Sequence, residues 1–535
     1  MKWIEKIKFP FVILLFGLYM GISNGVAVMK TTGWDADHLT ALVLGNLVLI
    51  FTLLVFWLLY RLGDKLGFGY SDFKGVKSRV NQELLTHYYW WSFGILGLLM
   101  VIVPLFFMIH VPDAGHDWDF FIIFNATSKL HGQSFAHLPM TTNALGYFLR
   151  YPNNQLFSIL FNQTFAGLTE ISLKIFVVTL VSSVLTSLAL LASSLLVRIL
   201  ADCRLAVLFN CCAAAFLPFY LYGAQLYTDT LTLPFVCLGL LCFVWAFKAL
   251  SVLTKLLGFS LSVTFLLIGF TFKPTVLIVL IAELIFLLVN KKWKAFGVVL
   301  ALFGVLVVAK DFGVKAIVSS DPVFSQENKE RYSLPVMHWI AMSWAPENKT
   351  GGFKKAIRLY TEQFDTYQKK QIATKQLFLN NLKKMGVLGV FRQIGRKLIY
   401  TWAYPDLNGL FYSLNHENPL IHRYFDYSPQ TKVGNVTGFI FLKMACFPYW
   451  AMVVWFMWRL IFKMMFHKYY WQQLWFILAV SVFGCTIFLI LWEANSRYLY
   501  NFSPLMLALA LYGYTNRSKK ENKNESDTLY GHSMF

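Results

Sequence analysis

The sequence predicts an all-α membrane protein that crosses the bilayer about twelve times. Of its 535 residues, 57% are hydrophobic, only 14% are charged, and the mean hydropathy is +0.55. Soluble domains carry about 25% charged residues, because a water-exposed surface needs them. Apolar runs of about 20 residues, the length that crosses a bilayer as a helix, recur along the chain. A polytopic helical protein with two large extracytoplasmic loops is therefore expected.

The net charge of +20 would indicate a nucleic-acid partner in a soluble protein. Here most Lys and Arg residues outside the second large loop lie in short segments between apolar runs, which is the pattern that orients membrane helices. No nucleic-acid partner is therefore expected. The seven cysteines lie in or at the ends of apolar runs, without zinc spacing or a disulfide framework, and are interpreted as packing residues.

The segment 1–88 is expected to form two transmembrane helices and a basic cytoplasmic loop. The helices cover about 9–28 and 39–60, and no small-residue cleavage site follows the first one. Lysines precede the first helix, and five Lys or Arg residues follow the second. Because short loops rich in Lys and Arg stay in the cytoplasm, the N-terminus is assigned there.

The segment 89–309 is expected to form a helical core with a first large outer loop at 111–169. Its short cytoplasmic loops are basic, whereas its short outer loops carry few charges, so the orientations of successive helices agree. The expected helices cover about 89–110, 171–197, 205–222, 229–247, 256–272, 274–290 and 295–309.

A second large outer loop is expected at 310–434. Its part from Lys383 to Tyr404 alternates basic and apolar residues, which predicts a helix lying on the outer leaflet. The alternative is a thirteenth span, but five Lys and Arg residues in this part argue against it.

The segment 435–514 is expected to contain the last helices, and the tail 515–535 is expected to be disordered and cytoplasmic. These last helices cover about 436–458, 472–492 and 498–514.

The carboxylates that could carry chemistry are Asp117 and Asp119, which follow the third expected span and precede an amphipathic segment. A carboxylate that is partly shielded at the membrane surface can act as a general base toward a hydroxyl or an amine. The alternative is that one or both only cap the following helix, because Asp favours the N-terminal end of a helix.

Other outer ends of expected spans also carry polar side chains, and ionisable residues at such a depth indicate function. Arg and Lys suit a phosphate, Arg as a fork and Lys as a point charge. The alternatives are that these cations extend to lipid headgroups, or that Glu493 and Arg497 form a simple helical ion pair. The side chains concerned are Tyr227, Asp229, Lys273, Glu493, Arg497 and Tyr498.

These motifs, in this order, resemble the GT-C superfamily of membrane glycosyltransferases, near the bacterial protein O-mannosyltransferase and aminoarabinose-transferase type. The resemblance implies an inverting transfer from a polyprenyl-phosphate sugar, with an Asp of the first outer loop as base. Asp119 fits that place better than Asp117, although this chain has Asp-Trp-Asp where the family often has Asp-Glu. The motifs are Asp119 to Ala126 with Leu130 and Gly132, Leu226 to Asp229, Phe272 to Thr275, and Trp492 to Tyr498 with Pro504.

We therefore expect a multi-pass cell-membrane enzyme that moves a sugar from a polyprenyl-phosphate donor to a polysaccharide, teichoic acid or protein on the outer face. Asp119 is expected to be the base, with Asp117 second. Lys273, Arg497 and Arg150 are expected to hold the phosphate. Asp229 and Glu493 are expected to orient the substrate or the basic residues, with Tyr227 and Tyr498 beside them.

Besides the lipid-linked donor, the expected partners are membrane lipids. No cofactor is predicted, and a divalent metal is left open. The alternatives are a transporter or flippase of lipid-linked saccharide and a non-catalytic protein of envelope assembly.

Overall fold

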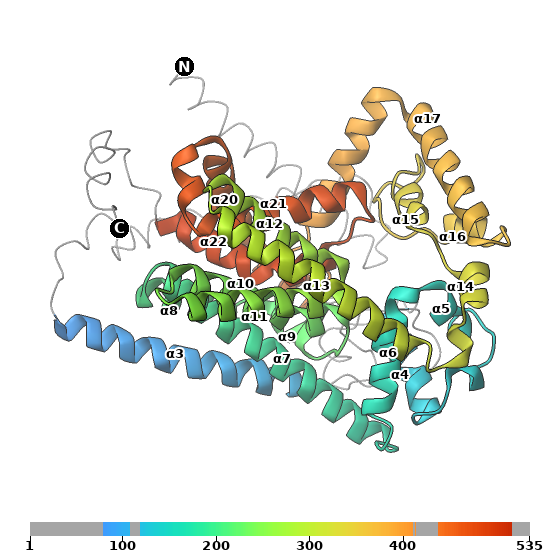
Figure 1. Ribbon diagram of the computed structural model, residues 1–535, viewed down its shortest axis with the longest axis horizontal. Coiled ribbons are helices and arrows are strands. Elements are labelled where there is room, and N and C mark those ends of the chain that lie inside the picture. The colour runs from blue at the N-terminus through green and yellow to red at the C-terminus, as the bar shows by residue number, and fades with distance from the viewer. Residues whose placement is uncertain (1–78, 107–117, 410–411, 413–436, 516–535) are drawn as a thin grey trace.

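The computed structural model describes residues 79–106, 118–409, 412 and 437–515, except the side chains of 79–82 and 437–445. The described residues form helices and connecting turns, and no strand occurs among them (Figure 1). The two spans expected before residue 79, Asp117 and the tail beyond residue 515 lie outside the described residues. The all-α class predicted from the sequence is confirmed.

Six of the described helices are long and apolar enough to cross a membrane, or seven if α8 (Cys203–Ala214) and α9 (Leu217–Gly223), bent by 60°, form one span. Each coincides with an expected span, but the expected total of twelve is not established. The six helices are α3 (Arg79–Phe106), α7 (Ile171–Leu200), α10 (Thr228–Lys248), α11 (Val252–Phe272), α13 (Trp293–Val318) and α20 (Thr437–Phe466).

Three expected spans correspond to shorter helices, and two of these are preceded by a 3-10 turn at the end of the bundle that carries the two large loops. α12 (Leu277–Val289) follows η3 (Pro274–Val276), and α22 (Ser503–Thr515) follows η6 (Ser496–Phe502). The third is α21 (Trp475–Leu491). These breaks place irregular backbone and polar side chains inside the bundle end, which is tolerated where the backbone is buried in protein.

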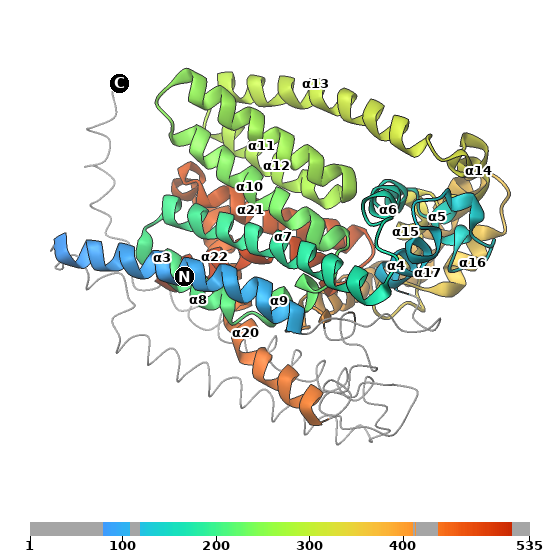
Figure 2. The same ribbon diagram turned by 90° about the horizontal axis from the view of Figure 1, so that it is seen from below.

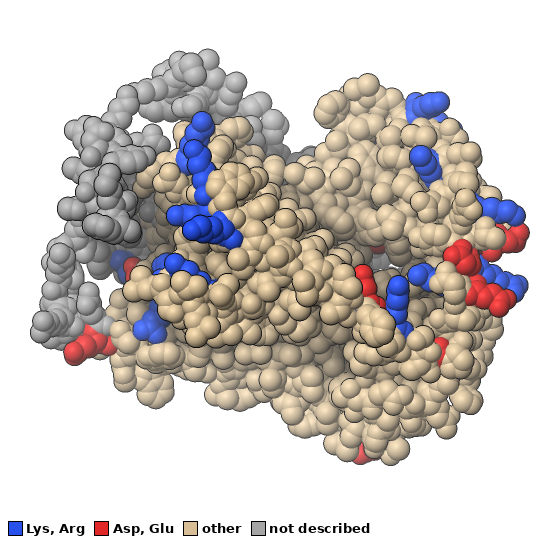
Figure 3. Space-filling model, in the orientation of Figure 1, with Lys and Arg blue, Asp and Glu red and all other residues tan. Residues whose placement is uncertain are grey.

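The long helices lie side by side, and the described segments of the two large loops predicted to be outside gather at one end of them as a lobe (Figures 1 and 2). The space-filling view shows Lys, Arg, Asp and Glu side chains toward the two ends of the bundle, with a broad uncharged surface between them (Figure 3). An uncharged band of this kind is what the hydrocarbon core of a bilayer requires.

The bundle packs around one large apolar core, in which α10 contacts α7 and α11 most extensively. Close approach of α10 and α11 depends on Gly258, because a Cβ there would lie 2.7 Å from the Cβ of Ala246. Small residues allow such backbone contact between membrane helices, where no hydrophobic effect drives association.

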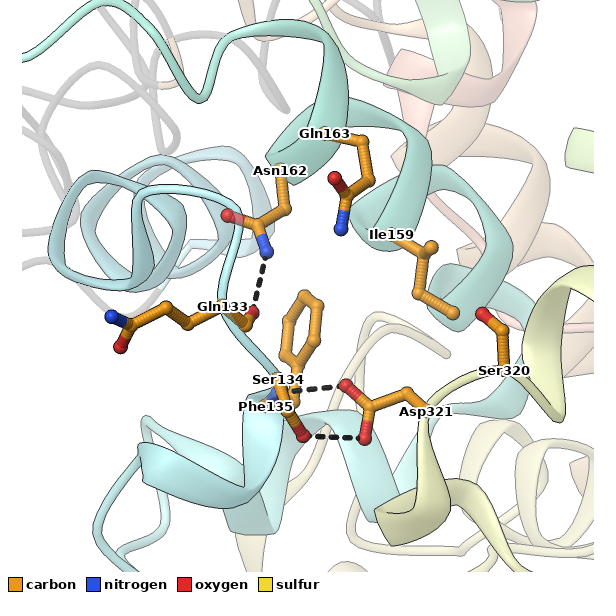
Figure 4. A pocket seen from close by; sticks show the side chains of 8 residues that line it. All are labelled: Gln133, Ser134, Phe135, Ile159, Asn162, Gln163, Ser320 and Asp321. Atoms are coloured by element: carbon orange, nitrogen blue, oxygen red, sulfur yellow. Dashed lines mark hydrogen bonds between the residues drawn. The ribbon is translucent and has the colours of Figure 1, made fainter.

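The lobe begins with α4 (Asp119–Leu130), α5 (Leu145–Arg150) and α6 (Pro152–Thr164), which share a second apolar core with Phe324 of the second large loop. Asp321 ties the two loops together: its carboxylate accepts hydrogen bonds from Ser134 Oγ and Phe135 N, both at 2.8 Å (Figure 4). A cavity of about 130 Å³ lies beside this tie. Asp321 also accepts a hydrogen bond from Val323 N, so this carboxylate has a structural role.

The rest of the lobe is α14 (Gln326–Tyr332), α15 (Val336–Ser343), α16 (Lys355–Glu362) and α17 (Tyr367–Trp402). α17 bends at Gly386, whose φ of 60° favours glycine. Its second arm, from the bend to Trp402, covers most of the helix expected at Lys383 to Tyr404. The place of that helix on the outer leaflet stays a prediction. α17 is not among the candidate spans, and its bend exposes Val387, Leu388 and Phe391.

Candidate active site

Asp119, the first residue of α4, directs its side chain away from its own helix. Its Oδ1 accepts a hydrogen bond from the Tyr147 hydroxyl at 2.8 Å, and its Oδ2 accepts one from the Tyr227 hydroxyl at 3.1 Å. The N-cap of α4 is Trp118, without a side-chain capping bond. Asp119 is therefore not the capping residue of α4. Its side chain is 30% exposed.

Tyr147 is itself fixed in place, because Asn154 Nδ2 donates a hydrogen bond to its hydroxyl at 2.6 Å. Burial raises the pKa of Tyr147 well above its usual value, and the neighbouring Asp119 carboxylate raises it further. The Tyr147 phenol therefore stays protonated and serves as a donor. No pattern in the sequence indicated the contact between Tyr147 and Asn154, because it joins two separate short helices of the loop.

Asp229 and Lys273 form a buried ion pair at the same end of the bundle. Asp229 lies in the first turn of α10, and Lys273 lies between α11 and η3 in an extended conformation, which a following proline favours. The exposed fractions of their side chains are only 3% and 9%. The neighbouring Asp229 carboxylate compensates the charge of Lys273, so Lys273 does not extend to lipid headgroups.

Arg497 connects the two acidic groups. Its Nη2 lies 3.6 Å from Oδ2 of Asp119, and its Nε lies 3.7 Å from Oδ2 of Asp229. The Arg497 side chain is only 8% exposed, so this cation does not extend to headgroups either. Asn495 Oδ1 accepts a hydrogen bond from Arg497 N at 3.0 Å and orders the turn that presents it.

Aromatic rings surround the Arg497 guanidinium. Its central carbon lies 4.4 Å from the ring centre of Trp118, 4.7 Å from that of Tyr412, 5.5 Å from Tyr498 and 5.6 Å from Tyr227. Rings at such distances attract a cation through their negative faces. They also exclude water, which strengthens the interaction of Arg497 with the two carboxylates.

Glu493 lies beside this cluster and is 6% exposed. Its Oε2 accepts a hydrogen bond from the Tyr498 hydroxyl at 3.3 Å. Burial raises the pKa of Glu493 to about 7, although Arg497 acts in the opposite direction. Residues 493–495 are not helical, and the helical ion pair between Glu493 and Arg497 does not form among the described residues.

Lys397 of α17 brings the second large loop to the same place. Its Nζ donates hydrogen bonds to the Trp492 carbonyl at 2.6 Å and to Ser343 Oγ at 2.9 Å. Burial lowers the pKa of Lys397 to about 7, while the charge of Glu493 acts to raise it. In the sequence Lys397 is one of several basic residues of an amphipathic stretch, so nothing distinguished it.

The structure thus brings together Asp119, Asp229, Lys273, Arg497, Glu493, Tyr227 and Tyr498 at one end of the bundle. Arg150 is different, because its Nε lies 3.4 Å from Oε1 of Glu362, whereas Lys273 and Arg497 pair with Asp229 and Asp119. In the part of the chain that the structure describes, no group of three or more His, Cys, Asp or Glu residues could hold a metal ion.

Comparisons with known proteins place the chain in a family. No curated protein matches it. Two structures of the oligosaccharyltransferase of Archaeoglobus fulgidus, AglB with an inhibitory peptide and a dolichol-phosphate and an apo form, are similar at 13% identity and a TM-score of 0.39. They cover 80% and 79% of this chain, which spans 50% of each; a likeness of this degree shows no shared activity. The family described as "Conserved hypothetical integral membrane protein" matches residues 70–518. The chain therefore belongs to this family of integral membrane proteins.

Proposed function

We propose that the protein is a membrane glycosyltransferase that moves a sugar from a polyprenyl-phosphate donor to an acceptor on the extracytoplasmic face. The observation that carries the proposal is the difference in exposure between the three clustered acids. The Asp119 side chain is 30% exposed, whereas Asp229 and Glu493 are buried. Asp119 is thus the acid that a substrate can reach.

In the proposed reaction, Asp119 takes the proton from an acceptor hydroxyl or amine as that atom attacks the anomeric carbon of the sugar. The bond between the anomeric carbon and the phosphate oxygen breaks, and the phosphate leaves with the electron pair. Hydrogen bonds from Tyr147 and Tyr227 fix the carboxylate and leave lone pairs free for the acceptor, because a carboxylate has about four. The role of Asp117 as a second carboxylate stays a prediction.

Arg497 is the proposed cation at the reacting centre, because it is the clustered cation that contacts the partly exposed acid, and its charge acts on the leaving phosphate through its field. Lys273 is paired with Asp229, so it acts through its field and by holding Asp229 against Arg497. A preorganised cation in a site that excludes water stabilises charge that develops in the transition state.

The test is release of polyprenyl phosphate from a panel of polyprenyl-phosphate sugars by the purified protein in detergent. Asp119→Asn should lower the rate about 100-fold or more, the range of a general base. Asp365→Asn is the matched control, because Asp365 is exposed in the same lobe, and its rate should be unchanged. Full activity of Asp119→Asn contradicts the base assignment, and no release by the unaltered protein contradicts the function.

One observation favours the alternative of a transporter of lipid-linked saccharide. Glu283 is fully buried within α12, and both of its oxygens lie 3.2 Å from Ser262 Oγ of α11. Acids inside a membrane often belong to proton or substrate pathways. Movement of a lipid-linked saccharide between leaflets of reconstituted vesicles, lost in Glu283→Gln and without release of polyprenyl phosphate, would establish this alternative.

A further inference from the structure

Two arginines of the lobe converge on one carboxylate oxygen. Arg150 ends α5, and Arg358 lies in α16; their Nε atoms lie 3.4 Å and 3.7 Å from the same Oε1 of Glu362. Both arginine side chains are 10% exposed, whereas Glu362 is 29% exposed. Arg358 was not singled out in the sequence, because it is one of many basic residues in this loop.

The positive charge of this group exceeds its negative charge. Two guanidiniums share one carboxylate, and neither Nε has a hydrogen-bond partner. Lys370, also buried, adds a third cation whose Nζ is held by the carbonyls of Arg331 and Ser333, and the charges of Glu362 and the exposed Asp365 act on it. No other carboxylate lies within ion-pair distance of these cations in the described part of the chain. Partly buried positive charge without a matching anion is costly.

This group adjoins the Asp119 site through two tyrosines. The guanidinium of Arg150 lies 5.6 Å from the ring centre of Tyr151. The Tyr151 ring packs against Tyr147 at 4.9 Å, and the Tyr147 hydroxyl donates to Asp119. The charges of Arg150, Arg358 and Asp119 all act on the Tyr151 hydroxyl, so the two arginines and the partly exposed acid belong to one neighbourhood.

We propose that Arg150 and Arg358 form a binding site for a phosphate group at the edge of the Asp119 site. Guanidiniums are planar forks that match phosphate oxygens, and two of them already converge here. Glu362 occupies part of that space and holds the two side chains in register until a phosphate replaces it. The identification of this phosphate as that of the lipid-linked donor rests on the proposed function, whereas the anion site itself does not.

The experiment measures binding without any sugar. The full-length protein is placed in nanodiscs with or without polyprenyl phosphate, and thermal stabilisation is followed; a second arm adds inorganic phosphate. Arg358→Gln should weaken binding about tenfold, and Arg358→Lys less, because Lys keeps the charge but loses the fork. Lys369→Gln is the matched control, since Lys369 is an exposed cation in the same lobe, and it should bind as the unaltered protein does. Stabilisation in the inorganic arm alone identifies free phosphate as the ligand.

Glu362→Gln separates a binding site from a structural ion triad. If phosphate competes with Glu362, this substitution should tighten binding about threefold to tenfold, because it removes the competing charge. Weaker binding in Glu362→Gln, or unaltered binding in Arg358→Gln, would overturn the proposal. Binding without release of polyprenyl phosphate would keep the anion site and refute glycosyl transfer. Transfer by Arg358→Gln with an unchanged KM for the donor would refute the identification of the bound phosphate as that of the donor.

Discussion

Arg497 Nη2 lies 3.6 Å from Asp119 Oδ2, which joins the turn before α22 to the start of α4. The same guanidinium lies 3.7 Å from Asp229 at the start of α10. One cation therefore joins the turn before α22, the start of α4 in the lobe and the start of α10. Residues from distant parts of the sequence thus position the partly exposed acid of the site.

Replacement of Arg497 should destabilise the protein as well as inactivate it. Arg497→Gln leaves Asp119 and Asp229 without their shared cation, and breaking a buried pair costs about 3–5 kcal/mol. Arg497→Lys should cost about 1–2 kcal/mol, because a cation remains but stacks less well on the surrounding rings. Unfolding in SDS titrations, with exposed Lys369→Gln as the control, measures both. Equal losses of unfolding free energy in Arg497→Gln and Arg497→Lys would show that the positive charge at position 497 does not stabilise the protein.

The Asp229–Lys273 pair should show strong coupling. Asp229→Asn leaves the Lys273 ammonium buried without its acid, and Lys273→Met leaves the acid with Arg497 alone. Each single change should cost about 3–5 kcal/mol, and the double change should cost less than their sum by about 1–3 kcal/mol. A double-mutant cycle of unfolding free energies checks this; additive effects would mean that the pair contributes no interaction energy.

Glu493 should make stability depend on pH. Its pKa is raised from 4.5 to about 7 in the folded protein, so between these values the folded state keeps a proton that the unfolded chain releases. Stability should therefore fall as the pH rises through this window, by about 3 kcal/mol. The charged and titratable groups that act on Glu493 are Arg497, Tyr498, Asp119 and Lys397.

The measurement is the unfolding free energy of the protein and of Glu493→Gln at several pH values from about 4.5 to 8. Glutamine does not titrate, so the decline over the window should become smaller. The same decline in both proteins would assign it to another group.

The bend of α17 should contact lipid. Val387, Leu388 and Phe391 are 78%, 75% and 67% exposed, and basic residues flank them, which suits the surface of an anionic bilayer. A nitroxide attached to Leu388→Cys should collide with oxygen more often than it collides with a water-soluble nickel chelate, because oxygen concentrates in lipid. The two collision rates are measured by electron paramagnetic resonance. Lys375→Cys, on the exposed first arm of α17, should show the reverse order. Cys211, the exposed cysteine among the described residues, is replaced by Ala in both proteins.

The all-α class and the described spans could be predicted from the sequence because both depend on local properties. A run of about 20 apolar residues has few alternatives to a membrane helix. The same locality showed that Asp229, Lys273 and Arg497 stand at helix ends. The local pattern could not show that Arg150 pairs with Glu362 and does not join the group of Lys273 and Arg497, because its partner depends on how the lobe folds on itself.

The sequence by itself determined where helices form and which ends carry charge, since hydropathy and charge distribution act along the chain. Only the tertiary structure decided which charges meet. It buried Asp229 against Lys273, left Asp119 exposed between two tyrosines, and brought Lys397 and Arg358 into places that no pattern marked. The physical reason is that an ion pair or hydrogen bond forms between side chains a few ångströms apart in space, whatever their separation in the chain.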